Sequence, residues 1–386
     1  MPKIGVMGGT FDPVHNAHVC MAQKAAQRLG LAKVVFVPGG NPPHKAQKNV
    51  TDKDLRFEMV KAATAGNPVF EVTDYEIKKK DYSYTADTLR YMTKMYPENK
   101  YYFIMGADSL DYIEKWHEPQ VIFALAEIVV FARKNFELRR KAHDVMETFG
   151  GHITILDDEI PDISSTRIRE DVDMGFDISA FVPHGAEEII QKNGLYRGEL
   201  TQLREKIKSA LEKSRFGHTM GVCRLAVQMA QRFGENRKKA YTAALLHDCA
   251  KNIPKDKMYE MCREYGVGLD EFELCNPALV HAKLGAYLAE HAYGIKDPDI
   301  INAVKWHTLG RCEMSRLEKI IFVADMAEEG RRFEGALPLR KAALQNLDKA
   351  VYMCAGATIR FNEGKGNPVH KNAYAVRDCF KKLCCD

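Results

Sequence analysis

Short apolar runs alternate with longer amphipathic stretches through the first half of the chain. Short runs bounded by Gly, Pro or polar residues are typical of buried strands, whereas apolar residues spaced three and four apart are typical of helices. Helices are expected over Val19–Ala26 and from Leu55 onward. The predicted strands are Ile4–Met7, Val34–Pro38, Phe70–Asp74, Tyr101–Met105 and Ile128–Arg133. Strands that alternate with helices predict an α/β fold with a parallel sheet.

The pattern changes after residue 198, where helical spacing of the apolar residues becomes almost continuous. Residues 199–213 are charged and favour helix, so we expect them to link the halves or to begin a second domain. Further helices are predicted at Ala240–Leu246, Leu279–Leu288, Pro298–Trp306 and Leu317–Met326. A chain of 386 residues is long enough for two domains with separate cores. We therefore expect an α/β domain over 1–198 and an all-α domain over 199–386.

The link between the first predicted strand and the first predicted helix carries the strongest motif of the first half. It reads Gly8-Gly9-Thr10-Phe11-Asp12-Pro13-Val14-His15-Asn16-Ala17-His18. Paired glycines let backbone N–H groups approach an oxyanion closely, and the helix start adds unpaired N–H groups and partial positive charge. His15 and His18 are three apart and share a helix face. A Gly pair alone is equally typical of a tight turn, and the segment is neither a Walker A loop nor a dinucleotide fingerprint.

Other polar side chains of the first half follow predicted strands or open predicted helices. Lys45 lies in a proline-rich loop after the second strand, and Asp108 follows the fourth strand. Open α/β sheets bind ligands beyond the carboxyl ends of their strands, so both positions favour a binding site. Ser164-Ser165-Thr166-Arg167 begins a helix with hydroxyls and a cation, which favours anion binding. Trp116 is compatible with either a core or a binding role.

The first half resembles the nucleotidyltransferases that carry an H-x-G-H motif, and more closely the bacterial nicotinate-nucleotide adenylyltransferases of the NadD family. The similarity is carried by G-G-T-F-D-P-x-H, N-P-P-H-K, S-Y-T-x-D-T-L and I-S-S-T-x-I-R, with Ala17 where the family usually has Gly. It implies a Rossmann-like fold and adenylyl transfer from ATP to nicotinate mononucleotide, with Mg²⁺. The implied catalytic residues are His15, His18, Lys45 and Arg167. The implied nucleotide- and substrate-binding residues are Gly8, Gly9, Thr10, Phe11, Thr85, Gly106, Asp108, Trp116, Arg133, Ser164, Ser165 and Thr166.

A series of His and Asp residues lies on the predicted helices of the second half. The candidate metal ligands are His218, His247, Asp248, His281, His307 and Asp325. One His on an apolar helix is commonly a core residue that has found a hydrogen-bond partner. A His-Asp pair flanked by leucines requires partners on burial, however. Imidazole and carboxylate together suit iron or manganese.

These residues resemble the HD superfamily of metal-dependent phosphohydrolases, and more closely its YqeK family. The similarity is carried by R-x-x-H-T, L-L-H-D-x-A-K, H-A-x-x-G-A, H-T-x-G and E-x-G-R. It implies symmetrical hydrolysis of diadenosine tetraphosphate to two ADP. One metal ion is implied on His218, His247, Asp248 and Asp325, and a second on His281 and His307 with Asp248 bridging. Asp248 and Lys251 are implied in catalysis, and Lys251 and Arg331 in contact with polyphosphate, although both cations are also compatible with a solvated surface.

Several alternatives remain open at the level of sequence. The first domain could prefer the amidated mononucleotide or another small phosphate acceptor. The second domain could act on guanosine tetraphosphate or a cyclic dinucleotide, or it could be a regulatory or RNA-binding module without activity. The sequence does not decide whether the chain forms a homo-oligomer.

Charge and cysteine usage refine this picture. Residues 1–198 carry 25 Lys and Arg against 28 Asp and Glu, a net charge of −3, and residues 199–386 carry 31 against 24, a net charge of +7. A basic second half suits polyphosphate ligands, but no dense Lys/Arg run with interleaved aromatics points to nucleic acid.

The 10 cysteines form no disulfide framework, which favours a reduced cytoplasmic location. We interpret Cys379, Cys384 and Cys385 as ordinary thiols near the end of the chain, although metal binding or oxidation is also open to them. No apolar run approaches the length of a membrane span, and none resembles a signal peptide.

Overall fold

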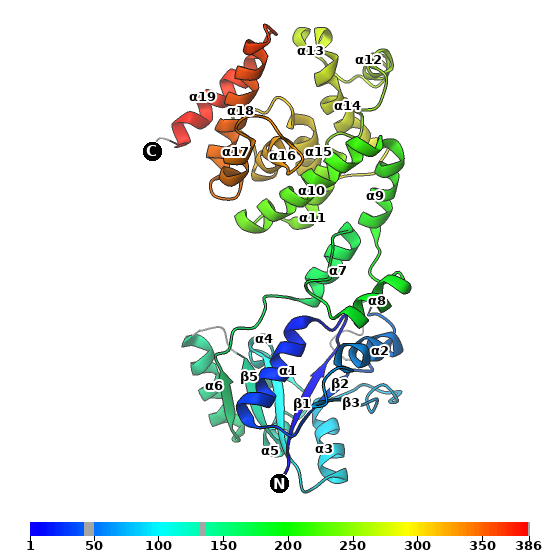
Figure 1. Cartoon of the computed structure of the whole chain (residues 1–386), viewed down its shortest axis with the longest axis vertical. Helices are drawn as coiled ribbons and strands as arrows, with labels where there is room; N and C mark the ends of the chain where they lie inside the picture. The colour runs from blue at the N-terminus through cyan, green and yellow to red at the C-terminus, as the bar shows by residue number, and fades with distance from the viewer. Residues whose placement is uncertain (42–49, 132–135, 385–386) are drawn as a thin grey trace. The chain divides into compact units, whose positions relative to one another are not determined.

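The computed structural model describes residues 1–41, 50–131 and 136–384, and the chain divides into two compact units, Met1–Arg197 and Gly198–Asp386 (Figure 1). Strands occur in the first unit: β1 Lys3–Gly9, β2 Lys33–Pro38, β3 Phe70–Val72, β4 Lys100–Gly106, β5 Ala126–Phe131 and β6 Ile153–Leu156. Its helices are α1 Asn16–Leu29, α2 Lys53–Thr64, α3 Thr85–Met95, α4 Ala107–Leu110, the 3₁₀ helix η2 Ile113–Lys115, α5 Pro119–Leu125, α6 Phe136–Phe149, α7 Ser165–Met174 and α8 His184–Lys192.

The strands of the first unit form a parallel sheet, six-stranded among the described residues, in the order β3-β2-β1-β4-β5-β6. Alternate residues of each strand enter different cores, as the period of a strand requires. In β2, for example, Val35 and Val37 belong to one core cluster and Val34 and Phe36 to the other. Both faces of the sheet are therefore covered, which explains why the interior positions of the central strands are apolar.

Helices pack on both faces of the sheet (Figure 1). Buried residues of α3, α4, α5 and α6 share one core cluster, and those of α1, α2, α7 and α8 share the other. The strand order reverses direction at β1, which pairs with β2 on one side and with β4 on the other. In sheets of this order the crevice at the carboxyl ends of these central strands is the usual ligand position.

Capping residues explain where two helices near this crevice begin. Asp52 precedes α2, and its carboxylate accepts hydrogen bonds from the backbone N–H groups of Asp54 and Leu55 at 2.9 and 3.3 Å. Ser164 precedes α7, and its hydroxyl accepts from the backbone N–H of Arg167 at 3.3 Å. Short polar side chains at these positions satisfy N–H groups that have no partner within the helix.

The second unit is helical throughout its described residues. Its helices are α9 Glu199–Ala210, α10 Lys213–Phe233, α11 Arg237–Leu246, α12 Lys255–Glu264, α13 Glu271–Cys275, α14 Pro277–His291, α15 Pro298–Trp306, α16 Arg316–Ala327, α17 Ala336–Ala343, α18 Leu347–Gly364 and α19 Lys371–Cys384. Residues 240–246 of α11 are buried without a break, and residues 320–324 of α16 likewise. A helix that is apolar on all sides belongs in a core, so these helices form the centre of the unit.

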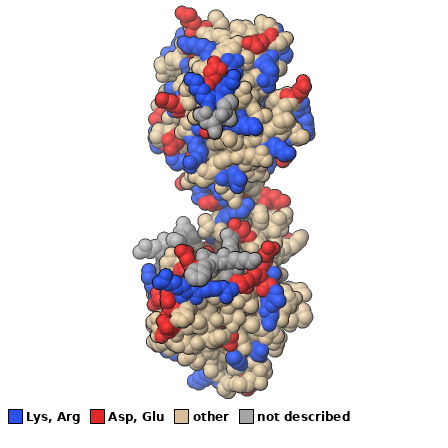
Figure 2. Space-filling view, turned by 90° about the vertical axis from the view of Figure 1, so that its left-hand side faces the viewer, with Lys and Arg blue, Asp and Glu red and all other residues tan. Residues whose placement is uncertain are grey.

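The predicted fold classes are confirmed, an α/β parallel sheet in the first unit and helices in the second. The sequence did not predict β6, which is short and mostly half-buried at the sheet edge. No helix within the described ranges is long and apolar enough to cross a membrane. On the face shown in Figure 2, Lys and Arg side chains of the second unit are interspersed with Asp and Glu.

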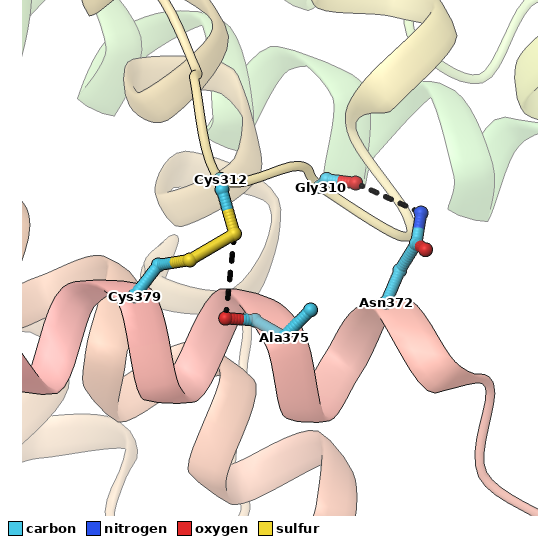
Figure 3. Close-up of a disulfide and its surroundings, with 5 residues drawn as sticks. All are labelled: Gly310, Cys312, Asn372, Ala375 and Cys379. Carbon is cyan, nitrogen blue, oxygen red and sulfur yellow. Dashed lines mark hydrogen bonds between the residues drawn. A yellow bond between two sulfur atoms is a disulfide. The ribbon is translucent and has the colours of Figure 1, made fainter.

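The interpretation of Cys379 as an ordinary thiol is wrong in this structure. Cys379 on α19 forms a disulfide with Cys312, which lies in the loop between α15 and α16 (Figure 3). The Asn372 amide on α19 donates to the Gly310 carbonyl of the same loop at 3.4 Å. The two cysteines are 67 residues apart, and proximity at this separation depends on the tertiary fold rather than on local sequence. Cys385 and the side chain of Cys384 lie outside the described residues.

Cys379→Ser should lower the stability of the helical unit, because the bridge closes a loop of 67 residues and restricts the unfolded chain. The chain-entropy relation gives about 4 kcal/mol for a loop of this length. Denaturant unfolding without reductant measures the effect. Cys312→Ser should match Cys379→Ser, and Cys275→Ser, at an exposed free thiol, is the control. Equal stability of all three variants and the wild type would show that the sulfurs do not pair in solution.

Candidate functional sites

The loop between β1 and α1 brings the two histidines of the first motif together. His15 is the residue that precedes α1, and His18 lies in the first turn of the helix. Their rings stack with centroids 3.7 Å apart, and the backbone N–H of His15 donates to Nδ1 of His18 at 3.2 Å. Since Nδ1 of His18 accepts this bond, the proton of a neutral His18 ring lies on Nε2. The Nε2 atom is therefore a hydrogen-bond donor.

Burial controls the charge of His15. Its side chain is buried, and this desolvation lowers the pKa of His15 to about 4. Its Nδ1 is buried and makes no hydrogen bond within the described residues. At neutral pH His15 is thus an uncharged ring with an unsatisfied polar atom, beside a donor on His18. Such a pair suits contact with an anion.

The start of α7 docks directly onto this loop. The Ser165 hydroxyl donates to the Pro13 carbonyl at 2.9 Å, and Nη1 of Arg169 donates to the Asp12 carbonyl at 2.7 Å. Arg167 lies in the same helical turn, with Nε 3.6 Å from Oδ2 of Asp171. The structure therefore brings the Ser164–Arg169 motif to the Gly8–His18 motif.

Arg56, in the helix predicted from Leu55 onward, is a central element of this site. Its guanidinium is buried and donates to the carbonyls of Thr51, Thr10, Gly39 and Gly40 at distances of 2.6 to 3.0 Å. These carbonyls belong to the loops that follow β1 and β2 and to the start of α2. Arg56 therefore fixes the positions of these loops. In the sequence, the only indication of this role was an Arg near the start of a predicted helix.

Asp12 supports the same loop from its other side. Its Oδ1 accepts from the Tyr196 hydroxyl at 2.8 Å, and its Oδ2 accepts from the Thr51 backbone N–H at 3.4 Å. Burial raises the pKa of Tyr196 well above its ordinary value, and the Asp12 carboxylate adds to the effect, so the phenol stays a donor. The sequence argument did not single out Asp12 or Tyr196, because a contact across most of the unit leaves no local pattern.

The remaining predicted residues of the first unit that the structure describes lie on several elements and loops. Gly8 is exposed, whereas Gly9 approaches the ring of Phe11, where a β-carbon would lie 3.0 Å from the ring. Thr85 is the first residue of α3, and exposed Asp108 follows Gly106 at the end of β4. Trp116 is partly buried and meets Phe103 edge to face at 6.0 Å. Thr10 lies in the loop after β1 and accepts from Arg56, and Thr166 is the second residue of α7. Lys45 and Arg133 lie outside the described residues.

The second unit brings all of its predicted metal ligands to one place. His218 comes from α10, His281 from α14 and Asp325 from α16, while His247 and His307 directly follow α11 and α15. Ligand atoms lie within 4.8 Å of one another in three groups that share members: His218 with His247 and Asp248, His247 with His307 and Asp325, and Asp248 with His281 and His307.

Hydrogen bonds orient three of these imidazoles in the same way. Nδ1 lies within 2.6 to 2.8 Å of the backbone carbonyl three residues earlier in His247, His281 and His307. A carbonyl only accepts, so each Nδ1 carries a proton, and the Nε2 atom of each ring is directed inward. His218 differs, because its Nδ1 lies 3.1 Å from Oε1 of Glu328.

Asp248 lies between the groups. Its Oδ1 is 3.1 Å from Nε2 of His281 and 3.9 Å from Nε2 of His307, whereas its Oδ2 is 3.4 Å from Nε2 of His247. Burial by itself would raise the pKa of Asp248, but His247 and His281 outweigh it and hold the pKa well below its usual range. Asp248 is therefore an ionised carboxylate with its two oxygens facing different imidazoles.

Cations surround this cluster. Nη1 of Arg215 donates to Oδ2 of Asp248 at 3.0 Å, and Nη2 of Arg331 donates to Oδ1 of Asp325 at 2.6 Å. Nζ of Lys251 lies 3.3 Å from Nε2 of His281. Arg331, which was predicted to contact polyphosphate, thus contacts Asp325, a predicted metal ligand. Arg215 belongs to the R-x-x-H-T motif, but no role was assigned to it from the sequence.

The cluster fits divalent metal ions. The Nε2 atoms of His281 and His307 lie 3.2 Å apart. Because the Nδ1 proton of each ring is donated to a backbone carbonyl, the Nε2 atoms of the neutral rings carry lone pairs that face each other. Burial, reinforced by the neighbouring His247 and His281, lowers the pKa of His307 to about 3, so protonation does not relieve this contact at neutral pH. Nε2 of His247 is buried without a hydrogen bond. A cation bound by these atoms would satisfy all of them.

Comparison with known proteins gives matches to both units. The family model Cytidylyltransferase-like matches residues 6–171, and the model HD domain matches residues 215–329. A probable nicotinate-nucleotide adenylyltransferase of Clostridium tetani is 44% identical over 200 residues, which is 51% of this chain and 100% of the relative. One of Clostridium botulinum (strain Loch Maree / Type A3) is 40% identical over 196 residues, 50% of this chain and 98% of the relative.

A crystal structure from Clostridium acetobutylicum, described as a predicted HD superfamily hydrolase involved in NAD metabolism, is 39% identical. It covers 47% of this chain and 96% of its own, with a TM-score of 0.46.

The parallel sheet with its histidine-bearing loop defines the first unit as a nucleotidyltransferase domain, and the His/Asp cluster lies in an HD domain. Through its first unit the chain belongs to the nicotinate-nucleotide adenylyltransferase family. It is a fusion of that domain with an HD domain, as the motifs predicted. The finer YqeK-type resemblance stays a prediction.

Proposed function

We propose that the chain is bifunctional and that its first unit transfers an adenylyl group from ATP to nicotinate mononucleotide. The reaction attributed to its relatives supports this choice. The observation that carries it is the docking of the start of α7 on the loop between β1 and α1. This contact gathers two anion-binding motifs at one end of the sheet, as a polyphosphate donor requires.

In this reaction a phosphate oxygen of the mononucleotide forms a bond to the α-phosphorus of ATP. The bond from that phosphorus to the bridging oxygen of the β-phosphate breaks, and pyrophosphate leaves with the bonding electrons. Catalysis of this step consists of alignment and charge stabilisation. His18 donates from Nε2, and His15, Arg167 and Lys45 complete the proposed catalytic set. Mg²⁺, bound with ATP, would offset the negative charge that develops on the leaving pyrophosphate.

We assign the remaining residues of the crevice to binding. The glycine loop and the start of α7 hold ATP, and the residues that follow β4 and begin α3 hold the acceptor. The proposed binding residues are Gly8, Gly9, Thr10, Phe11, Thr85, Gly106, Asp108, Trp116, Arg133, Ser164, Ser165 and Thr166.

His18→Ala should reduce kcat/KM for ATP by about 100-fold or more, because a donor to the transition-state phosphate is lost. Pyrophosphate release with nicotinate mononucleotide measures the effect. His143→Ala is the matched control, since His143 is exposed on α6. Wild-type rates in His18→Ala would contradict the assigned role. Faster turnover of the amidated mononucleotide by the unaltered chain would instead contradict the proposed acceptor.

For the second unit we propose symmetrical hydrolysis of diadenosine tetraphosphate. The position of Asp248 supports a two-metal arrangement, since its two oxygens face different imidazoles. His218, His247, Asp248 and Asp325 would hold one ion, and His281 and His307 the other, with Asp248 shared. Two ions of iron or manganese, when bound, supply the positive charge that activates water and stabilises phosphoryl oxygens.

The reaction divides the substrate between its two central phosphorus atoms. A water oxygen forms a bond to one of them, the bond from that atom to the central bridging oxygen breaks, and two ADP result. The proton released from water passes to solvent or to the leaving phosphate. Lys251 and Arg331 border the cluster and are assigned to the polyphosphate chain. The +7 charge of residues 199–386 favours the approach of this anion.

Purified full-length protein, stripped of metal and supplied with Mn²⁺ or Fe²⁺, should convert diadenosine tetraphosphate to ADP as sole product. His247→Ala should lose this activity, because one imidazole of the cluster is removed. His291→Ala, at an exposed position at the end of α14, should retain it. Chromatography of the products distinguishes the outcomes.

ATP with AMP as products would contradict the symmetrical reaction. Turnover of guanosine tetraphosphate or a cyclic dinucleotide alone would identify a different substrate. A metal-loaded protein that is inert and retains RNA would favour a regulatory module.

A further inference from the structure

Glu328 is a buried carboxylate beside the cluster but outside the set of proposed ligands. It directly follows α16, three residues after Asp325, and its residue exposure is 5%. Its Oε1 lies 3.1 Å from Nδ1 of His218, and its Oε2 accepts from the backbone N–H of Gly330 at 2.6 Å. A buried carboxylate requires such partners, and here one of them is a proposed metal ligand.

The contact distinguishes His218 from the other imidazoles of the cluster. His247, His281 and His307 each place Nδ1 against a backbone carbonyl. His218 places it against a side-chain carboxylate, which carries full negative charge when ionised and accepts more strongly than a carbonyl. Its other nitrogen, Nε2, faces Asp325 at 3.0 Å. Glu328 therefore controls the orientation of a ring whose free edge points into the cluster.

The surrounding backbone leaves space for this carboxylate. Gly221 lies one turn after His218 on α10, and a β-carbon there would lie 2.4 Å from Oε2 of Glu328. A β-carbon on Gly330 would lie 2.8 Å from Oε1. Arg340 donates to the carbonyls of Ala327 and Glu328, both at 2.7 Å. Glycines make room for the side chain, and an arginine fixes its backbone.

We propose that Glu328 is a positioning residue that holds His218 in the tautomer and orientation needed to bind a divalent metal ion. The Nδ1 proton is held by Oε1, so that the Nε2 lone pair faces the position shared with Asp325. Partners of this kind affect metal affinity without touching the metal. The inference rests on the proposed metal site of the second unit.

Glu328→Ala should weaken Mn²⁺ binding by about 10- to 100-fold, the usual effect of losing a carboxylate behind a ligating imidazole. The Mn²⁺ affinity of Glu328→Gln should lie between those of the wild type and Glu328→Ala, because the amide oxygen still accepts from Nδ1 but carries no charge. Glu329→Gln, at an exposed neighbouring carboxylate, is the control and should bind as the wild type does. Titration of the metal-free full chain with Mn²⁺ in competition with a chromophoric chelator gives each dissociation constant.

A glycine pair tests the inference with both His218 and Glu328 retained. Gly221→Ala should displace the carboxylate and reproduce the loss of Mn²⁺ affinity. Gly217→Ala, on the same helix with open space around the new methyl group, should not. Thermal unfolding of the metal-free variants separates a change in folding from a change in binding.

Wild-type Mn²⁺ affinity in Glu328→Ala and Glu328→Gln would overturn the positioning role. The same holds for a lower unfolding temperature of the metal-free variants with an unchanged dissociation constant. Failure of the wild-type chain itself to bind Mn²⁺ would overturn the proposed metal site, and this inference with it.

Discussion

Burial of a polar cluster in an apolar helical core is the constraint on which the second unit depends. His247, Asp248, His281 and His307 are almost completely buried, among helices whose other residues are largely apolar. Each imidazole of this set gives its Nδ1 to a carbonyl, which satisfies one polar atom and leaves the other directed inward. The facing lone pairs of His281 and His307 favour a cation, and the Nζ atom of Lys251 already lies 3.3 Å from Nε2 of His281. A bound cation would therefore both stabilise the buried cluster and supply the charge that its chemistry needs.

In the first unit, buried polar side chains hold the loops of the site in position. Its loops must hold backbone groups around a polyphosphate, and loops do not hold such positions by packing alone. Arg56 binds carbonyls from below, while Asp12 connects the loop to Tyr196 near the end of the unit. His15 can then remain uncharged, and both histidines still lie in fixed positions. In both units, residues behind the site determine the geometry of the residues that form it.

The sequence predicted the elements that carry the motifs, because apolar periodicity is a local property. It missed β6, where a short edge strand with half-buried residues gives a weak signal. It also missed the roles of Asp12, Glu328 and the Cys312–Cys379 pair, since each depends on contacts between distant segments. The ligand residues were accessible because a His-Asp pair among leucines is costly to bury without partners. The orientation of the imidazoles could not be predicted from the sequence. It depends on the contact of each Nδ1 with the backbone carbonyl three residues earlier, which follows from the local helix geometry.

The number of metal ions per chain tests the account most directly. Elemental analysis of the purified full-length protein, after saturation with Mn²⁺ and removal of free metal, should give two ions per chain. Asp248→Asn should lose both, because Asp248 faces both groups of imidazoles. A wild-type chain that retains no metal, or an Asp248→Asn chain that still retains two ions, would contradict the proposed site.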